Sequence, residues 1–306
     1  MALPCAATDR EFATVRLHLV DGTFELFRAH YSKRPQRHAP DGRDVKATVG
    51  LVASLLGLLA DADEQVTHLA VAFDNPIESW RNQRFAGYKS SEGVDPQLLA
   101  QFDGAEDAVR ALGVHVWSCG EHEADDALAA AAVRFAPEVD QVRVLTPDKD
   151  LAQVVDGQRI VQVDRARGSV RDEADVVERF GIPPPAIPEL LALIGDDADG
   201  IPGLPGFGAK TAATLLSHYP TVDAVPDEAD QWAVPVRGAA RLAGILAERR
   251  DDLALFCELT TLDTTIELGV DLHELAWAGV PRERFHAWCD QVGVEQLRDR
   301  PHRWAA

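Results

Sequence analysis

The sequence predicts an α/β fold in which a mostly parallel central sheet is flanked by helices and followed by a helical C-terminal part. Two observations lead to this fold class. Over the first half of the chain, short apolar runs rich in β-branched residues alternate with longer helix-like stretches, the pattern of parallel strands joined by helices. Beyond about Arg171 only helix-like stretches follow. We therefore expect a domain over residues 12–170 and a helical subdomain over residues 171–306.

Four short apolar runs are the expected strands. In chain order they span residues 15–20, 68–73, 141–145 and 159–163. The first two runs end at Asp21 and Asp74, and Asp148 follows the third. Ligands of parallel sheets bind beyond the carboxyl ends of the strands, so we expect these three aspartates to line one site.

The remaining stretches are the expected helices. Those between the strands span residues 47–60, 95–112 and 123–135, and those of the second half span 172–180, 186–194, 209–218 and 239–259. A group of prolines separates the first two helices of the second half.

The formal net charge is −20, from 30 basic and 50 acidic residues. Such acidity by itself argues against a nucleic-acid partner, because phosphate binding favours basic surfaces. The charge is unevenly spread, however. Basic residues gather in segment 28–46, which includes Arg28 and Lys33, and again in segment 81–89. The acidity therefore argues against a nucleic-acid partner without excluding one.

Other features of the composition indicate the compartment. The four cysteines form no Cys-x-x-Cys pair, which argues against a zinc site and for free buried thiols in a reducing cytosol. The N-terminal residues lack the basic and apolar regions of a signal peptide, and no apolar run approaches the ~20 residues of a membrane span. We expect a cytoplasmic protein without a membrane partner.

Acidic residues recur in five short motifs. The candidate ligands in them are Asp21, Asp74, Glu123, Asp125, Asp126, Asp148, Asp150, Asp196 and Asp199, and spacing alone does not decide whether Asp197 joins them. Each motif alone is typical of a helix start or a turn. Together they fall where the fold gathers a site, and so many carboxylates repel one another unless cations lie between them. We expect two or three Mg²⁺ or Mn²⁺ ions and phosphoryl chemistry.

A glycine-rich segment, residues 201–212, joins two of the expected helices. Gly206 and Gly208 would let the backbone approach a partner closely. The amides from Gly208 to Thr211 begin a helix and offer a phosphate seat, with Lys210 as the charge partner. We favour backbone binding to duplex DNA, and a tight corner between helices stays an alternative. A Walker A loop is excluded because an alanine separates the glycine from the lysine.

In their order along the chain, these motifs resemble those of the 5′ nuclease family, which comprises flap endonucleases and the 5′-nuclease domain of bacterial DNA polymerase I. The resemblance runs from about Arg16 to Asp263. It implies a PIN-like, resolvase-like nuclease core, a helical arch over about 78–112 and a helix-three-turn-helix over about 186–218, where the family binds a K⁺ ion. It also implies a stand-alone homologue of the polymerase domain.

The resemblance further implies roles for the acidic residues. A first metal ion would be held by Asp21, Asp74, Glu123 and Asp125. A second would be held by Asp148, Asp150, Asp196 and Asp199, while Asp126 would bridge to either ion.

The segment Trp-Arg-Asn-Gln-Arg-Phe-Ala-Gly-Tyr-Lys is similar to the start of the family's arch, through which a 5′ single strand passes. The resemblance implies that Lys89 and Arg81 are catalytic residues that steady the charge of the scissile phosphate. It also implies that Phe85 or Tyr88 stacks on a displaced base. Glu92 stands where the family usually has an arginine, so either another base replaces it or phosphate clamping is weaker.

The sequence thus predicts a metal-dependent, structure-specific 5′ nuclease, both flap endonuclease and 5′-3′ exonuclease, acting in replication or repair. We expect a monomer whose partners are flapped, nicked or gapped duplex DNA and RNA–DNA hybrids. The expected DNA contacts are Gly206, Gly208, Lys210, Thr211, Phe85, Tyr88, Arg28 and Lys33. Two alternatives stay open: a DNA-structure-binding relative of weak or no activity, and a PIN-type ribonuclease. The glycine-rich segment favours the nuclease, because small ribonucleases of that type normally lack it.

Overall fold

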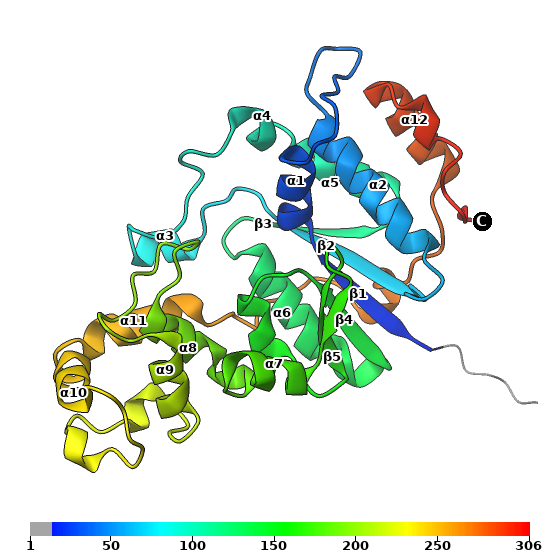
Figure 1. The fold of residues 1–306 in the computed structure, drawn as a ribbon. Coiled ribbons are helices and arrows are strands. Elements are labelled where there is room, and N and C mark those ends of the chain that lie inside the picture. Colours follow the sequence, from blue (N-terminus) through cyan, green and yellow to red (C-terminus); the bar gives the residue numbers. More distant parts are fainter. Residues whose placement is uncertain (1–13) are drawn as a thin grey trace, which may run out of the picture.

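The structure, a computed structural model, describes residues 14–306 (Figure 1). Its centre is a six-stranded sheet of order β3-β2-β1-β4-β5-β6, in which β6 runs antiparallel to β5 and the other pairs are parallel. The strands are β1 (Arg16–Asp21), β2 (His68–Asp74), β3 (His115–Cys119), β4 (Gln141–Leu145), β5 (Ile160–Asp164) and β6 (Ser169–Arg171). The predicted fold class is confirmed. The predicted domain start at residue 12 and Cys5 lie outside the described residues.

Sequence reasoning found four strands to within one residue and missed β3 and β6. β3 is an edge strand in which Ser118 is exposed and Val116 only half-buried, so its apolar pattern is weak. β6 has three residues and pairs with β5. Strands at sheet edges bury less surface and therefore leave a weaker apolar signal.

Helices cover both faces of the sheet, and for this reason its central strands are apolar on both sides. On one face lie α1 (Gly22–His30), α2 (Lys46–Ala60), α5 (Phe102–Ala111) and α12 (Arg282–Val292), packed on side chains that include Val71 and Phe73. The alanine-rich α6 (Ala124–Phe135) packs on Leu17 and Leu19 of the other face. Figure 1 shows α12 beside α2 and α5 although the sequence separates them widely.

Before α5 begins, the segment predicted as a helical arch is mostly irregular chain. It contains only the short helices α3 (Trp80–Arg84) and α4 (Pro96–Leu99) before α5 begins. Between α3 and α4 stand two glycines and two serines, which form helices poorly. The predicted helix 95–112 is also interrupted. There the side chain of Gln101 accepts from the amides of Ala47 and Thr48, at 3.0 and 3.2 Å, and so caps α2 instead of continuing a helix.

A helical subdomain with its own core follows the sheet. Its helices are α7 (Glu173–Phe180), α8 (Ile187–Ile194), α9 (Ala209–Leu216), α10 (Ala239–Glu248) and α11 (Arg250–Thr260). They bury Leu190, Leu215 and Phe256 among others. The predicted helix 239–259 is two helices, because the backbone leaves helical geometry at Arg249.

The chain returns to the sheet after α11, so the predicted subdomain 171–306 is too long at its C-terminal end. The amide of Trp277 donates to the carbonyl of Thr67 at 2.9 Å, and its indole N–H donates to the carbonyl of Leu112 at 3.1 Å. Phe285 and Trp288 of α12 belong to the core under α2 and α5. Cys119, Cys257 and Cys289 are free thiols, of which Cys119 and Cys289 are buried, as predicted, and Cys257 is half-buried. Among residues 14–306, none of the helices combines the length and apolarity that a membrane crossing requires.

Candidate active site

The carboxyl ends of the central strands bring predicted acidic residues to one edge of the sheet. β1 lies between β2 and β4, and all three run parallel. Asp21 and Asp74 are the last residues of β1 and β2, and Asp148 follows the end of β4. Glu123 immediately precedes α6 at the same edge, since β3 ends with Cys119 beside Asp74.

Hydrogen bonds fix the orientation of the first two aspartates. Asp21 caps α1: one oxygen accepts from the amide of Phe24 at 2.8 Å, and the other accepts from the hydroxyl of Thr146 at 3.0 Å. Asp74 Oδ1 accepts from the amide of Ala124, the first residue of α6, at 2.7 Å. Sequence reasoning did not select Thr146, although it opens one of the acidic motifs.

A second acidic group forms between two loops. Carboxylate oxygens of Asp150, Asp196 and Asp199 lie within 4.8 Å of one another. Asp150 Oδ1 is buried without a hydrogen-bond partner, a costly state for a carboxylate oxygen. Asp197 is exposed and lies outside this group. The all-carboxylate donor set and the orphaned oxygen fit a hard divalent cation.

The electrostatics of the edge also favour a cation. Burial, reinforced by the charge of Asp74, raises the pKa of Asp21 to about 7. Burial and the neighbouring charge of Asp148 raise the pKa values of Asp125 and Asp150 well above the ordinary range. An ion bound among these groups would restore their charged forms.

The raised pKa of Asp21 predicts how the stability of the metal-free protein depends on pH. The ordinary pKa is 3.8 and the folded pKa about 7, so between these values the folded protein binds more protons than the unfolded chain and stability falls as the pH rises. Asp21→Asn removes this contribution. In EDTA, from about pH 5 to about pH 8, we expect thermal unfolding of the wild type to shift down more than that of Asp21→Asn. Parallel curves would contradict the raised pKa.

The structure corrects the prediction that Arg81 contacts the scissile phosphate. Its side chain is 1% exposed, and its guanidinium donates to both oxygens of Asp126 at 2.7 and 2.8 Å. It also donates to the carbonyls of Leu259 at 2.8 Å and Thr261 at 3.1 Å, at the end of α11. Arg81 therefore joins α3, α6 and the helical subdomain, and acceptors of the protein itself occupy its Nε, Nη1 and Nη2 atoms.

The same ion pair corrects the prediction that Asp126 binds a metal ion. Besides Arg81, its oxygens accept from the amides of Glu123 at 3.0 Å and Asp263 at 2.9 Å. Burial would raise the pKa of Asp126, but the hydrogen bonds and charge of Arg81 outweigh burial and lower it. Protein groups thus satisfy this carboxylate without a cation.

Two lysines reach into the acidic edge. Lys89 Nζ lies 2.9 Å from a Glu123 oxygen and 3.2 Å from an Asp199 oxygen. Burial alone would lower the pKa of Lys89, but the surrounding acids, Glu123 foremost, raise it well above its ordinary value. Lys149 Nζ lies 2.5 Å from an Asp196 oxygen. Sequence reasoning missed Lys149 because it stands as a spacer between two candidate ligands.

The two residues predicted to stack on a base differ in how far the protein buries them. Tyr88 is 5% exposed, and its hydroxyl donates to Glu123 Oε2 at 3.3 Å. Phe85 is half-buried and packs edge-to-face on Phe256 of α11, with 6.0 Å between ring centroids. Tyr88 is thus enclosed by the protein, while stacking by the half-buried Phe85 stays a prediction.

The glycine-rich segment joins α8 to α9, as predicted. Gly206 has a φ of 87°, a conformation that favours glycine, and Gly208 caps α9. Lys210 is exposed and Thr211 half-buried in the first turn of α9. Within residues 14–306, the ammonium group of Lys210 has no acidic partner.

The basic residues predicted near the end of α1 differ in their surroundings. Arg28 Nη2 lies 2.5 Å from Glu25 Oε2, so its charge is partly neutralised. Lys33 is exposed, and no ion pair holds it in the part of the chain that the structure describes.

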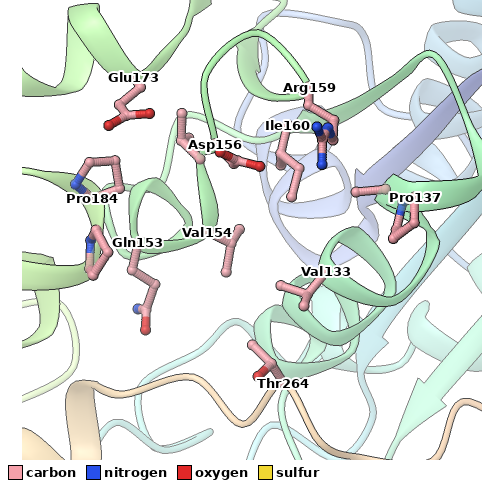
Figure 2. A pocket seen from close by; sticks show the side chains of 13 residues that line it. Val133, Pro137, Gln153, Val154, Asp156, Arg159, Ile160, Glu173, Pro184 and Thr264 are labelled. Atoms are coloured by element: carbon pink, nitrogen blue, oxygen red, sulfur yellow. The ribbon is translucent and has the colours of Figure 1, made fainter.

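A hollow of about 460 Å³ lies away from the acidic edge (Figure 2). Its lining includes Val133 near the far end of α6, Val154, Pro184 and the charged Asp156 and Glu173. None of the candidate metal ligands lines it, so it is separate from the site described above.

Comparisons with known proteins agree with this geometry. The sequence matches the family described as 5′-3′ exonuclease, N-terminal resolvase-like domain, over residues 16–181, and the family described as 5′-3′ exonuclease, C-terminal SAM fold, over residues 182–283. It is 36% identical to DNA polymerase I of Pseudomonas aeruginosa over 275 residues, which cover 87% of this chain and 29% of that protein. Against DNA polymerase I of Mycobacterium bovis it is 33% identical over 308 residues, covering 98% of this chain and 33% of that protein. The chain spans about a third of the length of these relatives.

Solved structures share the fold. T5 5′-exonuclease with bound divalent metal ions (zinc) superposes with a TM-score of 0.63 at 19% identity, over 81% of this chain and 90% of that one. The catalytic core of Rad2 in complex with DNA substrate superposes with a TM-score of 0.59 at 13% identity, over 94% of this chain and 91% of that one. On the strength of both domain matches, which follow one another from residue 16 to residue 283, the chain belongs to the 5′-3′ exonuclease family.

Proposed function

We propose that the protein is a divalent-metal-dependent, structure-specific 5′ nuclease that acts as a flap endonuclease and a 5′-3′ exonuclease. The observation that carries this proposal is the acidic edge of the sheet, where carboxylate oxygens of Asp150, Asp196 and Asp199 lie within 4.8 Å of one another and Asp150 Oδ1 has no hydrogen-bond partner. Membership in the 5′-3′ exonuclease family supports the same activity.

The residues that would hold the metal ions come from every acidic motif. They are Asp21, Asp74, Glu123, Asp125, Asp148, Asp150, Asp196 and Asp199. We propose Mg²⁺ or Mn²⁺, two or three ions per site, because carboxylate oxygens are the ligands these hard cations prefer. When bound, such ions make water a better nucleophile and offset the charge that develops on a phosphoryl group. The divalent ions bound to T5 5′-exonuclease support this part of the proposal.

Side chains of the protein would offset the charge of the scissile phosphate and hold the metal ligands in place. Lys89 stays protonated because its pKa lies well above the ordinary value, so it serves as a fixed positive charge for the scissile phosphate and not as a proton donor. Asp21 and Asp74 are held by hydrogen bonds and need no reorientation. Hydrolysis joins the water oxygen to phosphorus and breaks the bond to the 3′ oxygen, which leaves a 5′-phosphate on one product and a 3′-hydroxyl on the other.

The DNA would be held at the helix-three-turn-helix, with α9 and its exposed Lys210 facing duplex phosphates. The Rad2 core in complex with DNA substrate supports this partner class. We extend the proposal to a K⁺ ion at this motif, to RNA–DNA hybrids as substrates, and to a monomer working in the cytoplasm.

A panel of 5′-labelled substrates tests the proposed function. It comprises flapped, nicked, gapped and blunt DNA duplexes, an RNA-primed duplex and single-stranded RNA, each with Mn²⁺. We expect cutting where single strand meets duplex, with a 5′-phosphate on the downstream product. Preferential cutting of single-stranded RNA would replace this function with a ribonuclease. DNA binding without cutting would indicate a non-catalytic relative.

A further inference from the structure

Arg241 of α10 lies against the glycine-rich segment, although it stands 35 positions after Gly206 in the chain. A Cβ atom added to Gly206 would be 2.4 Å from Arg241 Nη2 and 3.1 Å from its Cζ. The guanidinium therefore rests directly on the bare backbone of the segment. Two features require a glycine at position 206. Its φ of 87° disfavours residues that have a side chain, and a side chain there would displace the guanidinium.

This guanidinium has no acidic partner within residues 14–306, whereas Arg249 and Arg250 further along the chain each have one. Arg249 Nε lies 2.7 Å from Asp252, and Arg250 Nη2 lies 2.8 Å from Asp227. Arg241 is exposed and its side chain takes part in no hydrogen bond in the described part of the chain. Lys210, in the first turn of the helix that follows Gly206, likewise has no acidic partner within residues 14–306.

We propose that Arg241 is a phosphate contact for the duplex arm of the substrate, working with Lys210, which follows Gly206 by four residues. The inference rests on the proposed DNA binding of the helix-three-turn-helix and adds to it a residue from outside that motif. A guanidinium offers a planar pair of donors that matches two phosphate oxygens. The guanidinium lies against the backbone of Gly206, three residues before the first residue of α9.

Arg241 contacts the backbone of the duplex and not the single-stranded flap. Removing it therefore weakens binding to every duplex sequence alike, and leaves binding to single strands unchanged. The contact also releases counterions, so its loss makes binding less sensitive to salt.

The test compares Arg241→Ala, Lys210→Ala and Arg249→Ala with the wild type. Arg249→Ala is the matched control. Arg249 lies between α10 and α11, and its side chain is already paired with Asp252. Affinity is measured by fluorescence anisotropy for a labelled blunt duplex, and for one of its strands alone, across a salt series without divalent ions. For Arg241→Ala we expect roughly 10-fold weaker duplex binding and a slope of log K against log salt that is smaller by about 1.

Arg241→Lys separates charge from shape. It should restore the salt slope while recovering only part of the affinity, because lysine lacks the paired donors. Thermal unfolding of each variant shows whether the fold is kept, and the single-strand affinity serves as an internal reference.

The outcomes test the assignment of Arg241 separately from the proposed DNA binding of the helix-three-turn-helix. If Lys210→Ala weakens duplex binding but Arg241→Ala behaves like Arg249→Ala, the assignment of Arg241 is wrong and the motif still binds DNA. If neither Lys210→Ala nor Arg241→Ala changes duplex binding, the proposed role of the helix-three-turn-helix fails as well.

Discussion

Asp150→Asn is expected to lower the rate of flap cleavage by roughly 10³-fold, because ions held by such carboxylates stabilise the transition state by several kcal/mol. Asp150 carries a buried oxygen that accepts no hydrogen bond and lies 4.0 Å from Lys149 Nζ, and it shares its surroundings with Asp196 and Asp199. The substitution keeps the shape of the side chain and removes its charge. Single-turnover cleavage of a labelled flap duplex measures the effect, while anisotropy shows that DNA binding persists.

Asp197→Asn is the matched control for this experiment. Asp197 belongs to the same acidic motif as Asp196 but is exposed and outside the group, so its loss should leave cleavage near the wild-type rate. Asp150→Asn should also raise the unfolding temperature in EDTA near neutral pH, because burial makes the charged form of Asp150 unfavourable and raises its pKa. Near-normal cleavage by Asp150→Asn, or equal damage from Asp197→Asn, would overturn the proposed ligand set.

Arg81→Lys is expected to slow cleavage by about 10- to 100-fold through loss of positioning, a size typical of groups that orient metal ligands. Lysine keeps the charge but cannot bind both oxygens of Asp126 together with the carbonyls of Leu259 and Thr261. The start of α6, and Glu123 with it, then loses its fixed place. The variant should need more Mn²⁺ for half-maximal rate and bind duplex DNA as the wild type does.

Arg84→Lys provides the comparison, since Arg84 lies on the same helix and forms an exposed pair with Glu258. Such pairs contribute little, so this variant should be close to wild type. If Arg81 touched the phosphate after all, Arg81→Lys would weaken binding of the flapped substrate and leave the Mn²⁺ requirement unchanged.

The sequence predicts those features that neighbouring residues in the chain encode. Asp21, Asp74 and Asp148 were found because an apolar strand and the residue that ends it are neighbours in the chain. The parallel order of the strands then brings such ends together. The glycine-rich segment was found for the same reason, since its turn and the helix after it are encoded within a few residues.

The features that sequence reasoning missed depend on distant partners. Arg81 was assigned to the phosphate, yet its partner Leu259 stands 178 positions away, and only the folded chain shows that its donors are occupied. Asp126 shares the spacing of a metal ligand, but Arg81 and the amides of Glu123 and Asp263 occupy its oxygens. No local sequence pattern marks Arg241, because its proposed role depends on the contact of α10 with Gly206, which only the folded chain shows.

The most direct test of metal-dependent 5′ nuclease activity is cleavage of a 5′-labelled flap duplex by the purified protein in Mn²⁺, in Mg²⁺ and in EDTA. We expect cutting at the flap junction with either ion and none in EDTA. The Mg²⁺ rate will show what the exposed Glu92 costs in place of an arginine. Cutting that persists in EDTA, or DNA binding without cutting in both metals, would contradict the proposed function.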